Sequence, residues 1–346
     1  MKEIKQEVKV EINFDNVPLK AIHYLKKLCF VLLLSLTSVT HAQDSITNFV
    51  VPKYIRAAYG EDPQQFVDFY KAESKNPTPL LVYIHGGAWS GGSASGIIKS
   101  DVFGKHNQHG EGIQELLNKG ISVASVEYRF VNKAKKAGVK PPVSWPMLDA
   151  ARAIQFIRSK SQEWNIDKTR IGATGSSAGG CTSLWLAMHS DMADKNSSDP
   201  IDRESTRMSC VGVLNAQSTL DPQQLFEWFV LPRYGGHAFG FVKYVDNKQV
   251  SDMDACLAAR DSIMPWIKEY SPIEWASSDD PPICLVYTAP PQKKGDPQTD
   301  SVHGAAFGVH LKEKLDSLGV ESYLIYPNCN ESNFPDHLAF LVKKLL

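Results

Sequence analysis

Ser177 lies at the centre of a Gly-x-Ser-x-Gly stretch, Gly175 to Gly179, that could supply a nucleophile. The stretch follows a short apolar run and leads into a helix-like run, Cys181 to Met188. A serine on a tight turn between strand and helix presents its hydroxyl clear of the backbone, and the glycines leave room for that turn. The helix N-terminus then brings a backbone N–H near a developing oxyanion. Because the pattern also occurs in turns without chemistry, other residues must support this interpretation.

A second stretch, His85-Gly86-Gly87-Ala88-Trp89, comes directly after the apolar run Leu80 to Ile84. An oxyanion hole uses the N–H of the residue after the nucleophile and an N–H from a loop after an earlier strand. A glycine pair lets that loop bring its backbone close to a substrate. We therefore expect His85 to brace the loop rather than to act as a base, and the oxyanion hole to be formed by Gly86, Gly87 and Ala178.

An acidic residue that orients a catalytic histidine is expected on the loop after the apolar run Ile283 to Tyr287. With this type of nucleophile turn, the chain order is serine, then acid, then histidine. The loop offers Asp296 and Asp300, and a predicted helix, Ala306 to Leu318, follows. We predict Asp300 as the acid and keep Asp296 as the alternative.

The histidine is expected after the last strand, Ser322 to Tyr326, where His337 is the only candidate. An imidazole titrates near neutrality, so it can take the proton of Ser177 while the acid fixes its tautomer. His303 is the alternative, but it precedes the last strand. We therefore predict His337 as the base. Two further histidines are interpreted as surface or cap residues, His237 and His310.

Alternating strands and helices must position these side chains. Besides the runs already named, Ile121 to Glu127 and Cys210 to Leu214 have the character of buried strands. Met147 to Trp164 is typical of a helix, because Ala150, Ile154 and Ile157 fall on one face. This alternation predicts an α/β fold with a mostly parallel sheet and helices on both faces. The less regular, aromatic-rich residues 215–270 are predicted to form a small cap that covers the site.

Composition sets limits on partners and cofactors. The chain of 346 residues has a net charge of −1 and no basic block, so we expect no nucleic-acid partner. Cysteine and histidine spacings match no zinc site, and we expect neither a metal nor an organic cofactor. After removal of an N-terminal segment, five cysteines remain, an odd number, and Cys256 with Cys329 is the only pair considered.

The first 42 residues have the pattern of a signal peptide. Lys26 and Lys27 precede an apolar run, Leu28 to Leu36, and the segment ends in small residues before Ala42. The apolar run is short for a membrane span. We expect cleavage after Ala42, a mature domain of residues 43–346, a secreted or periplasmic location and no stable membrane insertion.

The motifs together resemble those of the α/β-hydrolase superfamily, and within it the secreted carboxylesterases that include acetyl-xylan and feruloyl esterase-like enzymes. The resemblance is carried by three stretches, His85 to Trp89, Asp149 to Ala153 and Gly175 to Gly180, and it extends from about Tyr59 to the C-terminus with a gap in the middle. Ser176 stands where the hormone-sensitive-lipase-like branch has Asp, which argues against that branch. The resemblance also implies Asp300 as the acid.

The resemblance implies a serine hydrolase that cleaves carboxylic esters, possibly acetyl or feruloyl esters of carbohydrates. Ser177, His337 and Asp300 would form the triad, and the substrate would be a small-molecule or carbohydrate ester. The same machinery cleaves amides, so an arylformamidase-like or peptidase-like acyl hydrolase is an alternative. A non-catalytic binding protein on the same fold is another.

Overall fold

The structure is a computed structural model that describes residues 52–104, 107, 109–292, 300–329 and 333–346. The predicted signal peptide, residues 1–42, and Asp296 lie outside the described residues.

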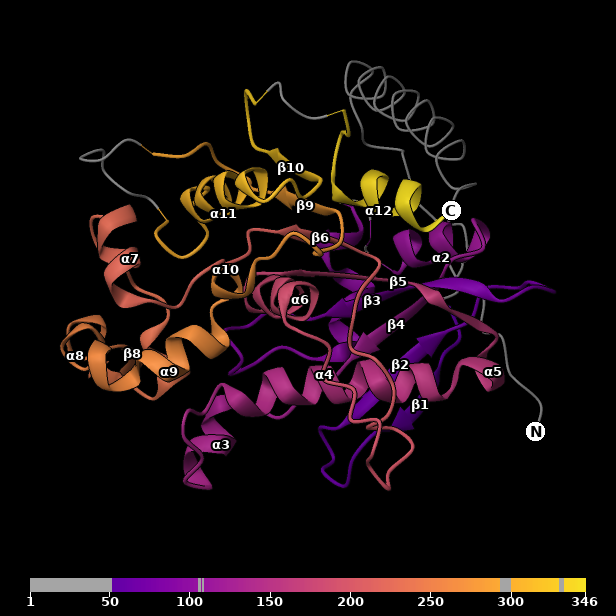
Figure 1. Ribbon diagram of the computed structural model, residues 1–346, viewed down its shortest axis with the longest axis horizontal. Coiled ribbons are helices and arrows are strands. Elements are labelled where there is room, and N and C mark those ends of the chain that lie inside the picture. Colours follow the sequence, from indigo (N-terminus) through magenta and orange to yellow (C-terminus); the bar gives the residue numbers. More distant parts are fainter. Residues whose placement is uncertain (1–51, 105–106, 108, 293–299, 330–332) are drawn as a thin grey trace, which may run out of the picture. The chain divides into compact units, whose positions relative to one another are not determined.

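One eight-stranded sheet forms the centre of the fold, with the strand order β1-β2-β4-β3-β5-β6-β9-β10 (Figure 1). The pairs from β4 through β3, β5, β6 and β9 to β10 are parallel, whereas β2 pairs antiparallel with both β1 and β4. The strands are β1 (Ile55–Ala58), β2 (Phe66–Tyr70), β3 (Thr78–Ile84), β4 (Ser122–Val126), β5 (Ile166–Ser176), β6 (Cys210–Leu214), β9 (Ile283–Val286) and β10 (Ser322–Ile325). All of them except β1 and β2 overlap the strand runs named in the sequence analysis. The mostly parallel sheet agrees with the prediction.

Side chains of a strand alternate between the two faces of the sheet, and each face is covered by helices. In β3, Leu80, Val82 and Ile84 belong to one buried cluster, whereas Leu81 and Tyr83 belong to the other. The first cluster includes residues of α4, α5, α6 and α11, and the second includes residues of α2 and α12. These helices are α2 (Glu111–Asn118), α4 (Ser144–Ser159), α5 (Ser161–Trp164), α6 (Ala178–Met188), α11 (Ala306–Ser317) and α12 (His337–Leu345).

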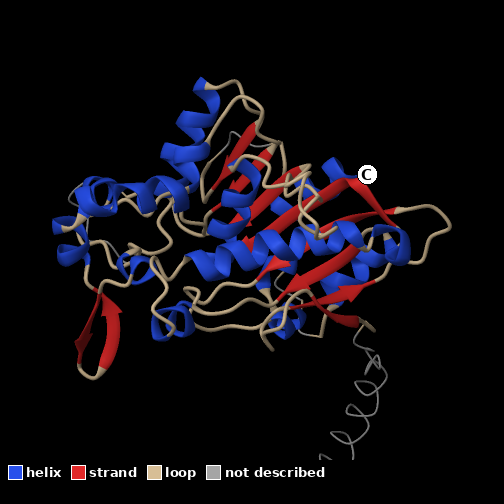
Figure 2. Ribbon diagram, turned by 60° about the horizontal axis from the view of Figure 1, so that its bottom comes forward, coloured by secondary structure: helices blue, strands red, loops and turns tan. Residues whose placement is uncertain are grey.

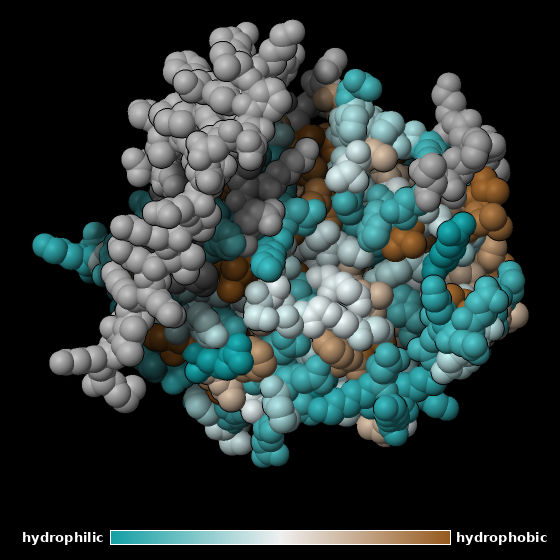
Figure 3. Space-filling model, turned by 180° about the vertical axis from the view of Figure 1, so that it is seen from behind, coloured by the Kyte–Doolittle hydropathy of each residue, from teal (hydrophilic) through white to brown (hydrophobic). Residues whose placement is uncertain are grey.

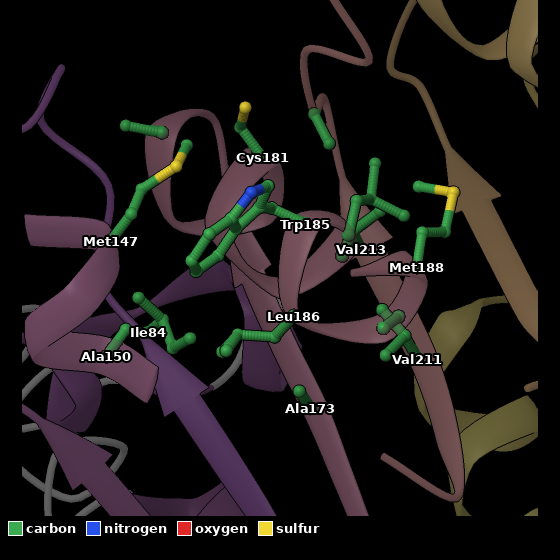
Figure 4. Close-up of a cluster of buried hydrophobic side chains, with 14 of the residues drawn as sticks. Ile84, Met147, Ala150, Ala173, Cys181, Trp185, Leu186, Met188, Val211 and Val213 are labelled. Atoms are coloured by element: carbon green, nitrogen blue, oxygen red, sulfur yellow. The ribbon is translucent and has the colours of Figure 1, made fainter. Parts of the chain in front are cut away.

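Helix α6 is buried throughout and anchors the nucleophile turn. Its side chains Trp185 and Leu186 pack between β-strand residues such as Ala173 and α4 residues such as Met147 (Figure 4). Every residue of α6 is buried, which is expected of a helix that is hydrophobic on all sides. The start of α6 is therefore held firmly against the carboxyl edge of β5.

The predicted helix over residues 147–164 forms as two helices, α4 and α5. The chain leaves the α4 conformation at Lys160, whose N–H still bonds to carbonyls of the last turn, and α5 ends at Asn165 in a left-handed conformation. The preceding short helix α3 spans Val131–Lys136, and two 3₁₀ helices, Ala94–Lys99 and Asp101–Phe103, follow β3.

Residues 215–270, the predicted cap, fold as short helices and one hairpin at one end of the sheet. Figure 1 shows α7, α8 and α9 side by side there, and Figure 2 shows the hairpin projecting from the body. The elements are α7 (Pro222–Trp228), a 3₁₀ helix (Gly236–Phe239), β7 (Val242–Val245), β8 (Lys248–Ser251), α8 (Met253–Ala258) and α9 (Arg260–Tyr270), and α10 (Pro272–Trp275) follows. On the face in Figure 3, hydrophilic side chains predominate and hydrophobic ones form small separate groups.

Candidate active site

Ser177 occupies a strained turn between β5 and α6. Its φ of 54° and ψ of −126° place it in a region that residues with a side chain rarely adopt. The turn is fixed at both ends, because the Ser177 N–H donates to the Leu214 carbonyl and the Ser177 carbonyl accepts from the Cys181 N–H. The side chain is half-buried. This geometry is that of the predicted nucleophile turn.

The glycines of the motif are required by close packing. A Cβ on Gly179 would lie 2.0 Å from the Ile84 carbonyl oxygen, and one on Gly175 would lie 2.5 Å from the same atom. Such contacts exclude any side chain, so the end of β3 packs directly against both sides of the serine turn. The pattern of glycines therefore has a steric cause as well as a conformational one.

The loop after β3 lies against the nucleophile. A Cβ on Gly86 would lie 2.7 Å from the Ser176 carbonyl oxygen and 3.5 Å from the Ser177 Cβ. Gly87 has a φ of 101°, which only glycine adopts without strain. Ala178 is the first residue of α6, where backbone N–H groups have no partner inside the helix. The three residues predicted for the oxyanion hole are thus brought to the same side of the sheet edge as Ser177.

The histidine that contacts the nucleophile is His303. Its Nε2 lies 3.0 Å from the Ser177 Oγ, and its Nδ1 lies 2.9 Å from the Asp300 Oδ2. The Asp300 Oδ1 also accepts the backbone N–H groups of Val302 and His303, at 2.8 and 3.1 Å. A single loop after β9 therefore holds both the acid and the histidine, three residues apart. Ser177, His303 and Asp300 form a continuous hydrogen-bonded chain.

The carboxyl of Asp300 is held in its charged form. Partial burial raises its pKa, but the hydrogen bonds from the His303 ring and from the two loop N–H groups outweigh this, and the net pKa lies below the usual value for Asp. A charged carboxylate accepts the His303 Nδ1–H, which leaves Nε2 free to accept the proton of Ser177.

The prediction of His337 as the base is not what the structure shows. His337 is the first residue of α12 and is 5% exposed, and its Nε2 lies 3.0 Å from the Val102 carbonyl oxygen. Burial lowers its pKa, which favours the neutral ring. Its neighbours Phe340 and Val102 belong to the cluster on the α2 and α12 side of the sheet. We conclude that His337 has a packing role and that His303, the alternative, takes the position beside Ser177.

Two contacts brace the loop that carries His303. The Gln217 Nε2, fully buried, donates to the Val302 carbonyl at 2.6 Å. The ring of Phe229, which follows α7, lies so close to Gly304 that a Cβ there would stand 2.7 Å from its Cε1. The loop is thus contacted on both sides of His303 by residues of the predicted cap, 215–270. Sequence reasoning missed Gln217, because nothing in its local pattern indicates a long-range contact.

His85 packs against and supports the loop after β3, residues 85–89, which we call the oxyanion loop after its predicted role. Its ring is buried and stacks on Tyr128 with ring centroids 4.2 Å apart, and its Nδ1 lies 2.8 Å from the Gly86 carbonyl. The Tyr128 hydroxyl donates to the His85 carbonyl at 2.7 Å. The Glu127 carboxylate, also buried, lies 3.5 Å from the His85 Nε2 and accepts the Ala94 N–H. These contacts leave His85 far from a role as base for Ser177.

The remaining predicted residues lie outside this site. His237, interpreted as a cap residue, packs among the aromatic rings of Trp89 and Tyr234. His310 lies on α11 and stacks on Trp228. The five cysteines within the described residues are all free thiols, so Cys256 and Cys329 do not pair. The described residues hold no cluster of three or more His, Cys, Asp or Glu side chains suited to a metal.

Comparison with known proteins identifies the family. A model of the BD-FAE family matches residues 67–290, well over half of the chain. The chain belongs to the BD-FAE family. The matched range includes the oxyanion loop and Ser177 but ends before the loop with Asp300 and His303. The family match therefore does not cover the residues proposed here as acid and base.

Individual relatives agree with this family. Esterase LipC of Mycobacterium tuberculosis is 30% identical over 129 residues, which are 36% of this chain and 27% of the relative. Gut esterase 1 of Caenorhabditis elegans is 26% identical over 136 residues, 38% of this chain and 22% of the relative. This chain thus spans about a quarter of the length of the curated relatives that it matches. The resemblance to carboxylesterases predicted from the motifs is confirmed.

Solved structures with the same fold cover most of the chain. An acetyl ester-xyloside bifunctional hydrolase from Caldicellulosiruptor lactoaceticus is 22% identical with a TM-score of 0.54, and the match covers 82% of this chain and 89% of that one. A truncated carbohydrate esterase from gut microbiota is 18% identical with a TM-score of 0.58, over 86% of this chain and 99% of that one. These matches confirm the α/β-hydrolase fold. Within the described residues, none of the helices combines the length and apolar character that a membrane span requires.

Proposed function

We propose that this protein is a serine hydrolase of carboxylic esters in which Ser177, His303 and Asp300 form the catalytic triad. The observation that carries the proposal is the unbroken chain of contacts from the Ser177 Oγ through the His303 ring to the Asp300 carboxylate, at 3.0 and 2.9 Å. These distances allow a histidine to take a proton from the serine hydroxyl while the acid holds its tautomer.

The reaction follows from these positions. The Ser177 Oγ attacks the ester carbonyl carbon as its proton moves to the His303 Nε2, and a tetrahedral oxyanion forms. The protonated His303 then gives this proton to the leaving alcohol oxygen, which leaves an acyl group on Ser177. A water molecule, deprotonated by the same ring, attacks the acyl carbonyl and releases the carboxylic acid. Asp300 stays charged and stabilises the imidazolium that forms twice in each cycle.

The oxyanion is proposed to bind to backbone N–H groups of Ala178 and of the Gly86–Gly87 turn. Ala178 begins a buried eleven-residue helix, so its N–H and the helix dipole both favour negative charge beside Ser177. The close approach of Gly86 to Ser177 supports a second donor from the Gly86–Gly87 turn. Removing one such donor typically costs about 10²–10³ in turnover.

The substrate is proposed to be a small-molecule or carbohydrate ester. This rests on the family match and on the carbohydrate-related activities named for the two solved neighbours. An amide-cleaving acyl hydrolase uses the same groups and is the alternative. A non-catalytic role is disfavoured because serine, histidine and acid are all in contact.

The proposal is tested by labelling and by hydrolysis of an ester panel. The protein is treated with a fluorophosphonate and the modified peptide is identified by mass, and hydrolysis of short-chain aryl esters, acetylated xylan, feruloyl esters and an aryl formamide is compared. We expect an adduct on Ser177, and turnover of esters that Ser177→Ala abolishes without changing the thermal melt. A labelled residue other than Ser177, or hydrolysis that survives the substitution, would refute the assignment.

We further propose export of the mature chain. The pattern around Leu28 to Leu36 is the support for this proposal. N-terminal sequencing of the protein from its native host should begin near Gln43. Recovery of a full-length chain from the cytoplasm would contradict it.

A further inference from the structure

A pocket of about 770 Å³ lies between the oxyanion loop and the cap. Its walls are mainly apolar and include side chains of the β7–β8 hairpin and of the segment before it, among them Leu231, Val242 and Val250. Neither Ser177 nor His303 lines this pocket, but Ala88 does, directly after the glycine pair that faces the nucleophile. The loop that packs against Ser177 therefore also forms part of the wall of this pocket.

One cation that lines this pocket, Arg233, makes no hydrogen bond or ion pair with another described residue. Every other arginine of the described residues makes a hydrogen bond or an ion pair, as Arg260 does with Asp221. Arg233 is exposed, lines the pocket, and makes no such contact within the described part of the chain. The Tyr234 hydroxyl beside it is buried and also has no hydrogen-bond partner among the described residues.

The second cation of the pocket, Lys243, is held between two carboxylates, and one of them, that of Asp254, also lines the pocket. The Lys243 Nζ lies 3.3 Å from a carboxylate oxygen of Asp252 and 3.9 Å from one of Asp254. Lys243 and its two carboxylates together carry a net charge of −1, so Arg233 is the cation of this lining that has no carboxylate partner among the described residues. A guanidinium beside an apolar wall matches a carboxylate well, because its planar fork can donate two parallel hydrogen bonds.

We infer that part of the substrate bound at Ser177 enters this pocket, and that Arg233 selects esters that carry a carboxylate on that part. This inference rests on the proposed esterase function and adds a substrate class to it. The apolar walls take the hydrocarbon portion between the ester and the carboxylate, and Arg233 binds the charged end at the pocket rim. Esters of the same length without a charge lose only this last contact.

The test compares matched ester pairs in wild type and Arg233→Gln. In the first arm, 4-nitrophenyl monoesters of adipic, pimelic and suberic acids are compared with 4-nitrophenyl hexanoate, heptanoate and octanoate, which places the carboxylate on the acyl side. In the second arm, 4-acetoxybenzoate is compared with its methyl ester, which places it on the alcohol side. Spontaneous hydrolysis is subtracted, and the ratio of kcat/KM between the two proteins cancels differences in intrinsic reactivity.

We expect Arg233→Gln to lower kcat/KM by about tenfold for carboxylate esters in one of the two arms, the acyl-side or the alcohol-side arm. The change should come mainly from a higher KM, because a charge-assisted hydrogen bond to the substrate is lost. The neutral esters should change by less than about twofold. Lys248→Gln is the matched control, because it removes one positive charge from the same hairpin without touching the pocket lining. Its effect on either class should stay within about twofold, since an exposed charge acts weakly at a distance. The Arg233 effect should shrink as salt is added.

Equal effects of Arg233→Gln on charged and neutral esters in both arms would overturn the inference. So would equal effects of Arg233→Gln and Lys248→Gln, because the preference would then reflect overall charge. If the wild type cleaves none of the esters and Ser177 takes no fluorophosphonate label, the proposed function fails and the inference falls with it. Hydrolysis of the neutral esters by the wild type shows that the proposed function holds, so a missing preference for carboxylate esters then counts against the role of Arg233 alone.

Discussion

The choice between His303 and His337 decides the proposed mechanism, and replacing each by Ala tests it. His303→Ala removes the group that lies 3.0 Å from the Ser177 Oγ. General-base catalysis contributes about 10²–10⁴ to rate, so kcat should fall by about that factor, or roughly 3–5 kcal/mol of activation free energy. The His303 side chain is 35% exposed, so the free energy of unfolding should change by less than about 0.5 kcal/mol.

His337→Ala should give the opposite result. The buried ring is lost from the start of α12 together with its contact to the Val102 carbonyl, and that carbonyl is left without this partner. We expect a loss of about 1–3 kcal/mol in the free energy of unfolding, with kcat on an aryl ester changed by less than about threefold. The two variants thus separate catalysis from packing.

The assay measures kcat and KM on one 4-nitrophenyl ester, beside thermal melts of both variants and wild type. Imidazole added to His303→Ala should restore part of the activity, because the half-exposed site leaves room for a small base beside Ser177. It should have no such effect on His337→Ala. A large loss of kcat in a well-folded His337→Ala protein, with near-normal activity in His303→Ala, would refute the reasoning and return the base to His337.

Three other outcomes follow from the same contacts. Asp300→Asn should lower kcat by about 10²-fold or more, because the imidazolium loses its charged partner, whereas Asp296→Asn should leave activity near normal in the same ester assay. Gln217→Glu should lower kcat more than it raises KM and should shift the pH dependence of kcat, because a carboxylate cannot donate to the Val302 carbonyl. An unchanged pH dependence of kcat would contradict a role of Gln217 in positioning His303. Burial lowers the pKa of His237 to about 4 in the folded protein. As pH falls, the imidazole of the unfolded chain is therefore protonated before that of the folded chain. The free energy of unfolding should then decrease by up to about 3 kcal/mol between about pH 6.5 and pH 4. Denaturant melts at several pH values should show a smaller loss in His237→Gln than in wild type.

The parts of the fold that local patterns determine could be predicted. The run Cys210 to Leu214 forms β6 with the predicted bounds, and the buried runs before the two glycine motifs form β3 and β5. Buried parallel strands are read from continuous apolar stretches, and the serine turn from its glycines. These signals need no knowledge of distant contacts, so the turn that holds Ser177 between β5 and α6 could be predicted from the sequence.

The histidine that contacts Ser177 could not be predicted in this way, because its position depends on how a loop folds back over the sheet edge. Chain order favoured His337, which follows the last strand, and this criterion ignores the three-residue spacing between Asp300 and His303. That spacing lets Asp300 accept a loop N–H with one oxygen and the His303 ring with the other. A histidine three residues after an acid, on a loop that follows a sheet strand, is the signal that could have indicated the pair.

Placing acid and base on one loop changes what must be held rigid. In a site built from two loops, each hydrogen bond depends on a separate segment, whereas here the contact between His303 and Asp300 is local and survives any movement of the loop as a unit. Only the contact to Ser177 depends on the position of the loop. The buried Gln217 and the ring of Phe229 fix that position from opposite sides of His303. Since Phe229 belongs to the predicted cap, the cap helps to set the distance between the His303 Nε2 and the Ser177 Oγ.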